Sequence, residues 1–392
     1  MLTNETIKIV ESTIPLLAEH GEEITRHFYD KLLTENPELK NVFNPSNQAQ
    51  GGQAKALAGA VFAYANNLND LSVLLPTVAR IAHKHVSLGV KPEQYPIIGN
   101  ALLSAIQDVA DLPDGHPALI AWGEAYGMLA DVFINAEENL YQENENSPGG
   151  WRGFREFIID DIKMESPNVK SFYLKPKDKG ATPSFKGGQY VGTKVILENE
   201  KYEQIRQYSL SSFPKQGYLR ITPKAEPKGV VSNYLHQAKI GSSLLLQAPT
   251  GTFNLDREAQ NHIFIAAGVG ITPLISMLYE ALDNNVNPDN ILFIQTQHDA
   301  ESELFKQELA ALKEKTGFHY QVQVTAGNDA NYVNEQRIGQ WAKDADIALA
   351  NDTAVYLCGP KSFMSAMKQD CEKLNVSSSG IHFEMFGPTE AV

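Results

Sequence analysis

One short segment, residues 263–273, constrains the fold more than any other part of this chain of 392 residues. It is an apolar run that ends in two closely spaced glycines and continues as Ile271-Thr272-Pro273. The pattern predicts a buried strand, a turn at Gly268-Val269-Gly270 and then a helix. Glycines in such a turn let a pyrophosphate approach the backbone, and the N-terminus of the helix attracts its charge. The segment therefore predicts a nucleotide-binding α/β region.

The chain changes character near residue 145, which indicates more than one domain. Residues before that point show apolar side chains at helical spacing, and residues 143–150 are polar and end in Ser-Pro-Gly-Gly. Short alternating segments separated by Gly and Pro follow as far as residue 256, and apolar strands then alternate with helical stretches. We expect an all-α domain at 1–143, a linker at 144–150, an antiparallel β-barrel at 151–257, and an α/β domain with a parallel sheet at 258–392.

Composition excludes several classes of protein. Lys and Arg number 33 against 47 Asp and Glu, so the net charge of −14 disfavours nucleic acid and anionic membranes as partners. The only cysteines are Cys358 and Cys371, which excludes a zinc finger, a c-type haem attachment motif and a disulfide framework, and fits the reducing cytoplasm. No signal peptide is evident, and the most apolar stretch is broken by glycine and proline, so we expect no integral membrane segment.

Two histidines in the segment 76–88 are expected to lie on different faces of a helix. His85 shares its face with Val78, Ile81 and Ala82, so it points into the core, whereas His83 is expected to face solvent. A core histidine bonded to a carbonyl is the common explanation of such a side chain. The alternative is an axial ligand to haem iron.

A carboxylate in a later helix is expected to be buried as well. Glu137 shares its helical face with Ala130, Phe133 and Ile134, while the neighbouring Glu138 falls on another face. A buried carboxylate needs a partner that satisfies its charge.

The pattern Arg206-Gln207-Tyr208-Ser209 predicts a flavin site. A guanidinium matches a pyrophosphate in geometry and charge, Tyr208 can pack on the isoalloxazine ring, and Ser209 can hydrogen-bond the flavin. With Gly188-Gln189-Tyr190 before it and residues 229–233 after it, the spacing resembles the ferredoxin reductase-like FAD domain. Residues 229–233 should open a helix whose N-terminus faces phosphate.

The helical third resembles the globin domain of bacterial flavohaemoglobins, and the resemblance runs over essentially the whole chain. It continues through the segments Lys91-Pro92-Glu93-Gln94-Tyr95 and 121–127. The residues that carry it, in order and spacing, are Tyr29, Phe43, Gln53, Leu57, His85, Tyr95 and Glu137.

The resemblance implies a haem pocket with two unlike sides. His85 binds the iron on the proximal side, and Tyr95 and Glu137 organise the proton on its other ring nitrogen, which increases electron donation to iron. On the distal side Tyr29 donates a hydrogen bond to bound dioxygen, with support from Gln53. Leu57 restricts the pocket and Phe43 lines it. Lys84 is either a residue that tunes the haem potential or an ordinary exposed lysine.

The resemblance also implies the flavin and nucleotide contacts. Glu384 helps set the flavin potential, and Met385 stands where many relatives carry Cys, so the hydride-transfer rate or nucleotide access could differ. The implied FAD residues are Tyr190, Arg206, Gln207, Tyr208, Ser209, Val231, Ser232, Met385, Phe386, Gly387 and Pro388. The implied NAD(P) residues are Gly268, Val269, Gly270, Ile271, Thr272, Pro273, Cys358, Gly359 and Pro360.

The function implied by the resemblance is that of a nitric oxide dioxygenase with one haem b, one FAD and NADH or NADPH as electron donor. Its small-molecule partners are NO and O2, and its product is nitrate. No basic cluster follows Gln295-Thr296-Gln297-His298, which favours NADH. The alternatives are an anaerobic NO reductase, an NAD(P)H oxidase or a haem-based gas sensor. A monomer is expected, and lipid or azole binding and the arrangement of the domains stay open.

Overall fold

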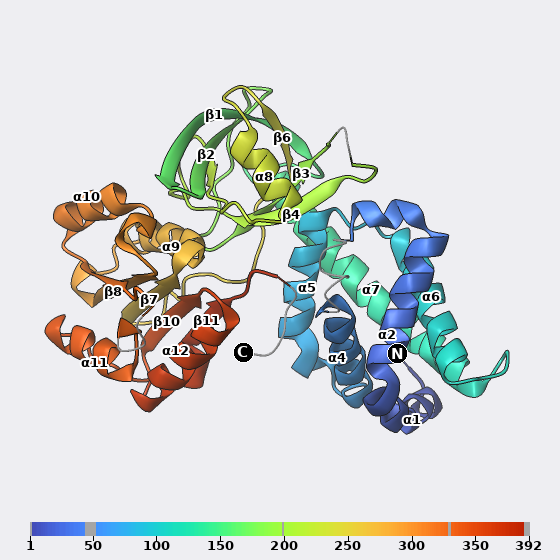
Figure 1. The fold of residues 1–392 in the computed structure, drawn as a ribbon. Helices are drawn as coiled ribbons and strands as arrows, with labels where there is room; N and C mark the ends of the chain where they lie inside the picture. The colour runs from blue at the N-terminus through green and yellow to red at the C-terminus, as the bar shows by residue number, and fades with distance from the viewer. Residues whose placement is uncertain (1, 44–51, 198–199, 328–330, 388–392) are drawn as a thin grey trace.

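The computed structural model describes residues 2–43, 52–197, 200–327 and 331–387, which form three folded regions (Figure 1). A helical region comes first, an antiparallel β region is second, and an α/β region with a parallel sheet is third. The expected fold class is therefore confirmed. The barrel contacts both of the other regions and lies above them in Figure 1.

The helical region packs around two cores. One joins α2, α6 and α7, and the other packs Ala82, Tyr95 and Phe133 together between α5 and α7. The last three residues of α7 lie within the segment 144–150 expected as a linker. The helices are α1 (Asn4–Ser12), α2 (Ile14–Glu35), η1 (Pro37–Asn41), α4 (Gly52–Asn66), η2 (Leu71–Leu74), α5 (Leu75–Leu88), α6 (Gln94–Val109) and α7 (Pro117–Asn146).

The β region is an antiparallel sheet with the order β4-β3-β6-β1-β2-β5. A bridge between Leu210 and Ile221 joins the two edge strands, so the sheet closes into the expected barrel. Its elements are β1 (Arg155–Ser166), β2 (Val169–Pro176), β3 (Tyr190–Val195), β4 (Gln204–Ser209), β5 (Leu219–Ile221), α8 (Val230–Gln237) and β6 (Ser243–Leu246).

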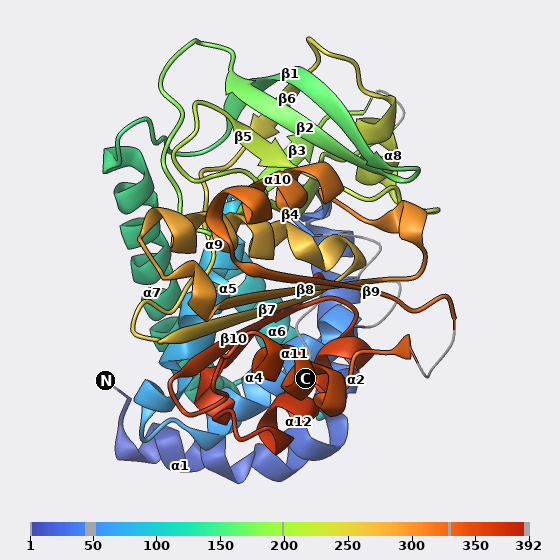
Figure 2. The same cartoon turned by 90° about the vertical axis from the view of Figure 1, so that its left-hand side faces the viewer.

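The α/β region has a parallel sheet with the order β11-β10-β7-β8-β9, covered on both faces by helices (Figure 2). Helices α9 and α10 pack on one face, and α11 and α12 pack on the other. Its elements are β7 (Asn261–Ala267), η3 (Gly268–Gly270), α9 (Ile271–Asp283), η4 (Pro288–Asn290), β8 (Ile291–Gln297), η5 (Ala300–Ser302), α10 (Lys306–Thr316), β9 (His319–Val324), α11 (Glu335–Asp344), β10 (Thr353–Cys358), α12 (Lys361–Lys373), η7 (Ser378–Gly380) and β11 (Ile381–Glu384).

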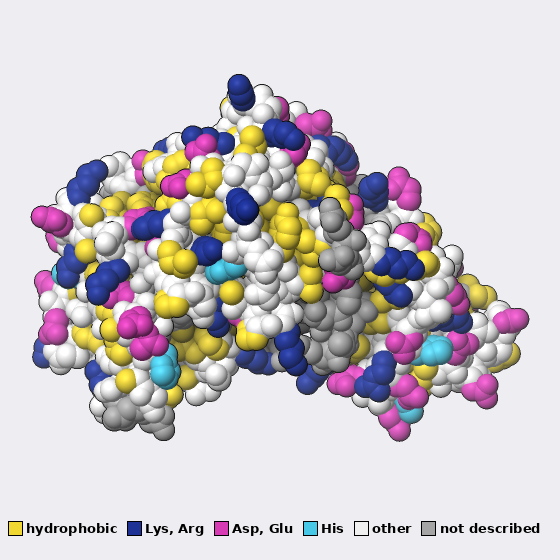
Figure 3. Space-filling view, turned by 45° about the horizontal axis from the view of Figure 1, so that its top comes forward, with side chains coloured by type: hydrophobic (Ala, Val, Ile, Leu, Met, Phe, Trp, Pro, Cys, Tyr) yellow, Lys and Arg dark blue, Asp and Glu magenta, His cyan; other side chains and the backbone are white. Residues whose placement is uncertain are grey.

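The surface carries charges of both signs. Basic and acidic side chains are interspersed over the face shown in Figure 3, so the net charge of −14 is not gathered into one acidic patch there. Among the helices of the described residues, none has the length and apolar character that crossing a membrane requires.

Candidate functional site

His85, Tyr95 and Glu137 come together from three helices. The Nδ1 atom of His85 lies 2.7 Å from Oε1 of Glu137, and the Tyr95 hydroxyl donates to the same oxygen at 2.5 Å. The Glu137 side chain is only 4% exposed, so it has the partners that a buried carboxylate needs. A histidine that donates from Nδ1 to this carboxylate oxygen has a lone pair on Nε2, which is the arrangement that suits a metal ligand.

Local packing explains why these three side chains meet. The Phe133 ring lies against both the His85 ring and the Tyr95 ring, with centroids 5.7 and 6.5 Å apart. Burial, reinforced by the Glu137 charge, raises the pKa of Tyr95 well above its usual range, so its hydroxyl keeps its proton. Glu138 points elsewhere and pairs with Arg152, as the helical spacing predicts.

The opposite candidate group consists of Tyr29 on α2, Phe43, and Gln53 and Leu57 on α4. Burial raises the pKa of Tyr29 far above its usual range, although a hydrogen bond with the Gln53 side chain lowers it in part. The phenol therefore keeps its proton and can donate a hydrogen bond. The Phe43 ring meets the Tyr29 ring edge-on at 5.7 Å. The Oε1 atom of Gln53 is buried with no hydrogen-bond partner among the described residues. A buried polar atom of this kind fits a pocket that receives a polar ligand.

His83 does not face solvent, and that prediction is wrong. Its Nδ1 lies 2.5 Å from Oγ1 of Thr250 and 3.0 Å from the backbone N of Gly251, both in the barrel. The face of α5 that would be exposed in an isolated helical domain is covered by the neighbouring region. Burial lowers the pKa of His83 to about 4.

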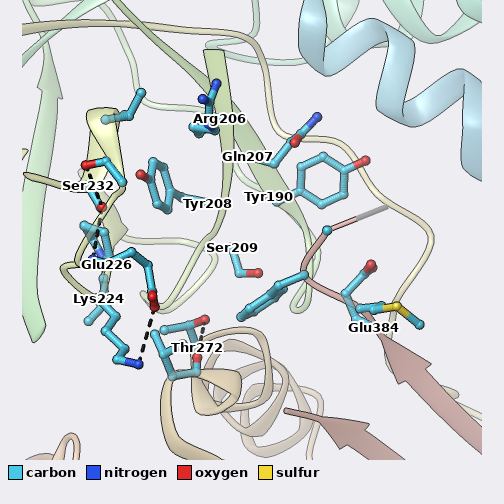
Figure 4. Close-up of a pocket in the computed structure, with 18 of the residues that line it drawn as sticks. Tyr190, Arg206, Gln207, Tyr208, Ser209, Lys224, Glu226, Ser232, Thr272 and Glu384 are labelled. Carbon is cyan, nitrogen blue, oxygen red and sulfur yellow. Dashed lines mark hydrogen bonds and ion pairs between the residues drawn. The ribbon is translucent and has the colours of Figure 1, made fainter. Parts of the chain in front are cut away.

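A cavity of about 940 Å³ lies at the centre of the molecule, near the upper end of the size range of ligand pockets. Figure 4 shows strand β4 along one side of it, α8 at one end and the N-terminus of α9 below. Most of the predicted flavin residues line it, and Pro388 lies outside the described residues. Those that line it are Tyr190, Arg206, Gln207, Tyr208, Ser209, Val231, Ser232, Met385, Phe386 and Gly387, together with Glu384.

The cavity fits an anion at Arg206. Its guanidinium donates to the Ile205 carbonyl at 2.8 Å and to Oε1 of Gln204 at 3.2 Å, both of them neutral acceptors. No ion pair joins it to a carboxylate in the described parts of the chain, although it is half-buried. Gly229 caps the N-terminus of α8, which opens at the cavity as predicted. A guanidinium bonded only to neutral acceptors among the described residues and a helix N-terminus together suit a pyrophosphate.

Acid and base side chains meet at the other end of the cavity. Burial raises the pKa of Glu384 to about 7, while the charges of Arg80 and Lys84 lower it in part. The Lys84 Nζ atom lies 3.5 Å from the Gly387 carbonyl oxygen, and Lys84 lines this cavity. Arg80 was missed by the sequence reasoning, although its i, i+4 spacing from Lys84 places both on one face of α5.

The two predicted nucleotide segments meet at the carboxyl edge of the sheet. Gly268 has a φ of +53°, which favours glycine. A Cβ on Gly270 would lie 2.2 Å from the Cys358 carbonyl oxygen, so this glycine lets the turn after β7 pack against Cys358-Gly359-Pro360. Val269 and Thr272 also line the cavity. Burial raises the pKa of the Cys358 thiol, which stays protonated.

Three protein families match successive parts of the chain. The globin family matches residues 26–133, the oxidoreductase FAD-binding domain matches residues 156–255, and the oxidoreductase NAD-binding domain matches residues 264–369.

Full-length relatives share the same order of regions. The flavohemoprotein of Oceanobacillus iheyensis is 43% identical over 405 residues, covering 100% of this chain and 98% of its own. That of Bacillus subtilis is 41% identical over 397 residues, covering 99% and 98%.

Two solved structures are also similar. A flavohemoglobin from Malassezia yamatoensis, crystallised with FAD and heme, matches the fold with a TM-score of 0.82 at 24% identity, over 98% of this chain and 100% of that one. The FAD/NAD-binding domain of a nitric oxide dioxygenase from Vibrio cholerae is 33% identical over 60% of this chain and 100% of that one, with a TM-score of 0.52.

Proposed function

The chain belongs to the flavohemoprotein family, and on that premise we propose that it is a nitric oxide dioxygenase that converts NO and O2 to nitrate with electrons from NADH. The 33% identity of its last 60% to part of a nitric oxide dioxygenase supports this proposal. The observation that carries it is the contact of His85 with Glu137 in the same chain as the flavin cavity. A reductase that served an external acceptor would not need that helical site.

Haem b on His85, FAD in the central cavity and NADH at the glycine turn would supply the redox chemistry, from hydride uptake to oxidation of NO. Glu137 accepts a hydrogen bond from Nδ1–H of His85 and gives the imidazole partial anionic character, which would strengthen its donation to a metal through Nε2. Tyr95 holds Glu137 in place through its short hydrogen bond. These residues favour the activation of oxygen over its storage.

The distal residues orient and shield the reacting gas. Tyr29 keeps its hydroxyl proton and so donates a hydrogen bond to an oxygen ligand, while the Phe43 ring holds the Tyr29 ring from the side. Gln53 offers a second polar group without a partner at its Oε1. Leu57 packs against the same hydrophobic core as Tyr29 and Phe43, and it narrows access to the haem pocket.

Residues of the cavity bind and orient the electron carriers. Arg206 and the N-terminus of α8 would bind the pyrophosphate of FAD, and Tyr208 would contact its ring. Glu384, with its pKa near 7, holds or releases a proton beside that ring. Residues 268–273 and Cys358-Gly359-Pro360 hold the nucleotide at the carboxyl edge of the sheet.

The test measures NO consumption and nitrate formation by the purified protein with NADH, in air and without oxygen. Stoichiometric nitrate in air supports the dioxygenase. Its absence in air would leave an NO reductase or an NADH oxidase. Failure of NADH to reduce the haem would favour a gas sensor. We also propose that the protein is a monomer and that it acts in the cytoplasm, where the free thiols of Cys358 and Cys371 would stay reduced.

A further inference from the structure

Helix α5 faces the barrel (Figure 1), carries His85 and lines the cavity through Arg80 and Lys84. His85 points from it toward Glu137 on α7. His83 and Ser87, which are spaced i and i+4 and therefore share a face, contact the barrel instead. One helix thus carries the candidate iron ligand on one face and the barrel on another.

The contact of His83 defines its protonation state from geometry. The backbone N–H of Gly251 can only donate, so Nδ1 of His83, 3.0 Å away, accepts. The imidazole is therefore the neutral form with its proton on Nε2. Oγ1 of Thr250, a residue 1% exposed, lies 2.5 Å from the same nitrogen. Two barrel residues thus meet one acceptor on the helix.

The contact of Ser87 links the helix to the wall of the flavin cavity. Nε2 of Gln207 donates to Oγ of Ser87 at 3.1 Å, and Gln207 lines the cavity. A Cβ on Gly192 of β3 would lie 1.7 Å from the Ser87 carbonyl oxygen. The barrel therefore approaches the helix as closely as a backbone without a side chain allows.

We propose that His83 is a positioning residue for electron transfer from the flavin to the haem. It acts through the α5 seam, defined as His83 and Ser87 on the helix and Gly192, Gln207, Thr250 and Gly251 on the barrel. The inference rests on the proposed function, which places haem at His85 and flavin in the cavity. His83 is two residues from His85 on a rigid helix, so a loosened seam moves the iron ligand relative to the flavin.

The first test compares His83→Ala, His83→Asn and His27→Ala in the full-length holoenzyme. His27 is a matched control because its ring bonds Asp108 within the helical region. Stopped-flow absorbance follows flavin reduction by NADH and then haem reduction, without oxygen. We expect His83→Ala to leave flavin reduction unchanged and to slow haem reduction about tenfold. A lost buried hydrogen bond would lower by about that factor the fraction of molecules in which α5 is held against the barrel.

His83→Asn should restore the rate to within about threefold of the parent, since its Oδ1 stands where Nδ1 accepts. A general loss of stability would slow haem reduction equally in His83→Ala and His83→Asn. A positioning role predicts that only His83→Ala is slow. Equal haem reduction in His83→Ala, His83→Asn and the parent overturns the proposal.

A second variant, Gly192→Ala, places a methyl group in the seam. It should slow haem reduction as well and increase the hydrogen exchange of residues 75–89 and 247–252, a readout independent of turnover. Unchanged exchange in both Gly192→Ala and His83→Ala contradicts the positioning role. Failure of the proposed function looks different: the purified parent would lack haem or flavin, or NADH would not reduce its flavin.

Discussion

The barrel meets its two neighbours through different chemistry. Toward the α/β region the junction is charged: the Arg220 guanidinium, 3% exposed, forms a bidentate pair with Glu308 of α10 at 2.7 and 2.9 Å. Toward the helical region, Arg152 pairs with Glu138 of α7 where both side chains are more than a third exposed, but the α5 seam contains the neutral pair of His83 and Thr250 and a close approach at Gly192. The charged junction therefore depends on ionised partners, whereas the seam depends on shape and directional hydrogen bonds.

The difference follows from what each junction has to hold. The charged junction fixes α9 and α10, and the N-terminus of α9 is the nucleotide turn. The backbone N–H groups of Gly187 and Gly188 donate to Glu280 and Ser276 of α9. The segment that leads into β3 is therefore bonded directly to α9. Burial opposes ionisation of Glu308, but the bonds from Arg220 prevail and its pKa lies below the usual range. Breaking this pair leaves an unpaired buried charge.

The largest expected effect is that of Glu308→Ala. It leaves Arg220 buried without its partner, so we expect the reductase transition to lose about 3–5 kcal/mol. Chemical unfolding followed by flavin fluorescence measures it, with the globin transition recorded separately by haem absorbance because a multidomain chain does not unfold in two states.

The control for that effect is the double variant Arg220→Met with Glu308→Leu. Replacing both charges by apolar groups is often neutral, so it should recover most of the loss. Equal destabilisation by the single and double variants would mean that packing around Phe305, rather than the charge, holds the junction.

Gly89→Ala tests a second contact of α5 with the barrel, next to the α5 seam, and should have a smaller effect. Gly89 ends the helix with a φ of +74°, and a Cβ there would lie 2.9 Å from Nε2 of Gln247 and 3.1 Å from the Phe154 ring in the barrel. The left-handed backbone alone costs a residue with a side chain about 1–2 kcal/mol. Calorimetry should show the loss in the globin transition. A loss confined to the reductase transition would contradict a role of this contact in holding α5.

The parts of the site that the sequence predicts are those set by local backbone or by helical period. The turn at Gly268 to Gly270 is a local pattern, and the facing of His85 and Glu137 follows from the faces of two helices. The exposure of His83 was predicted wrongly because Thr250, 167 residues away, covers it. No local pattern predicts the burial of Arg220 either. It lies in a short strand, and only its pairing with Glu308 of α10 explains why it is buried. Contacts between regions depend on how the folded regions pack together. The spacing of apolar residues along a sequence predicts which face of a helix is buried within its own region, but it does not predict that packing.

Acid should destabilise the α/β region through two of its histidines. Burial lowers the pKa of His262 and of His382 from an ordinary value of 6.5, so the unfolded chain binds protons that the folded one resists. Stability from these groups is complete above about pH 6.5 and is lost as pH falls below it. We expect the reductase midpoint to drop by about 2–4 °C between pH 7 and 5.5.

His262→Phe is the matched variant for the pH effect. The His262 ring lies nearly parallel to the neighbouring rings of Phe264 and Tyr356, with interplanar angles of 12° and 9°, so a phenyl ring fits the same place. The variant should show a shallower pH dependence of the reductase midpoint over the same range. An identical slope in parent and variant would assign the acid effect to other groups.

Lys215→Met should have the smallest effect, and it separates buried from exposed charge within one junction. Lys215 of the barrel pairs with Asp283 at the end of α9, but its side chain is 64% exposed. Water and salt screen such a pair, so its loss should change stability by about 0.5 kcal/mol or less and should vanish at high salt. Denaturant unfolding at low and high ionic strength measures both points. A loss near that of Glu308→Ala would show that the number of ion pairs, and not their burial, holds the nucleotide region to the barrel.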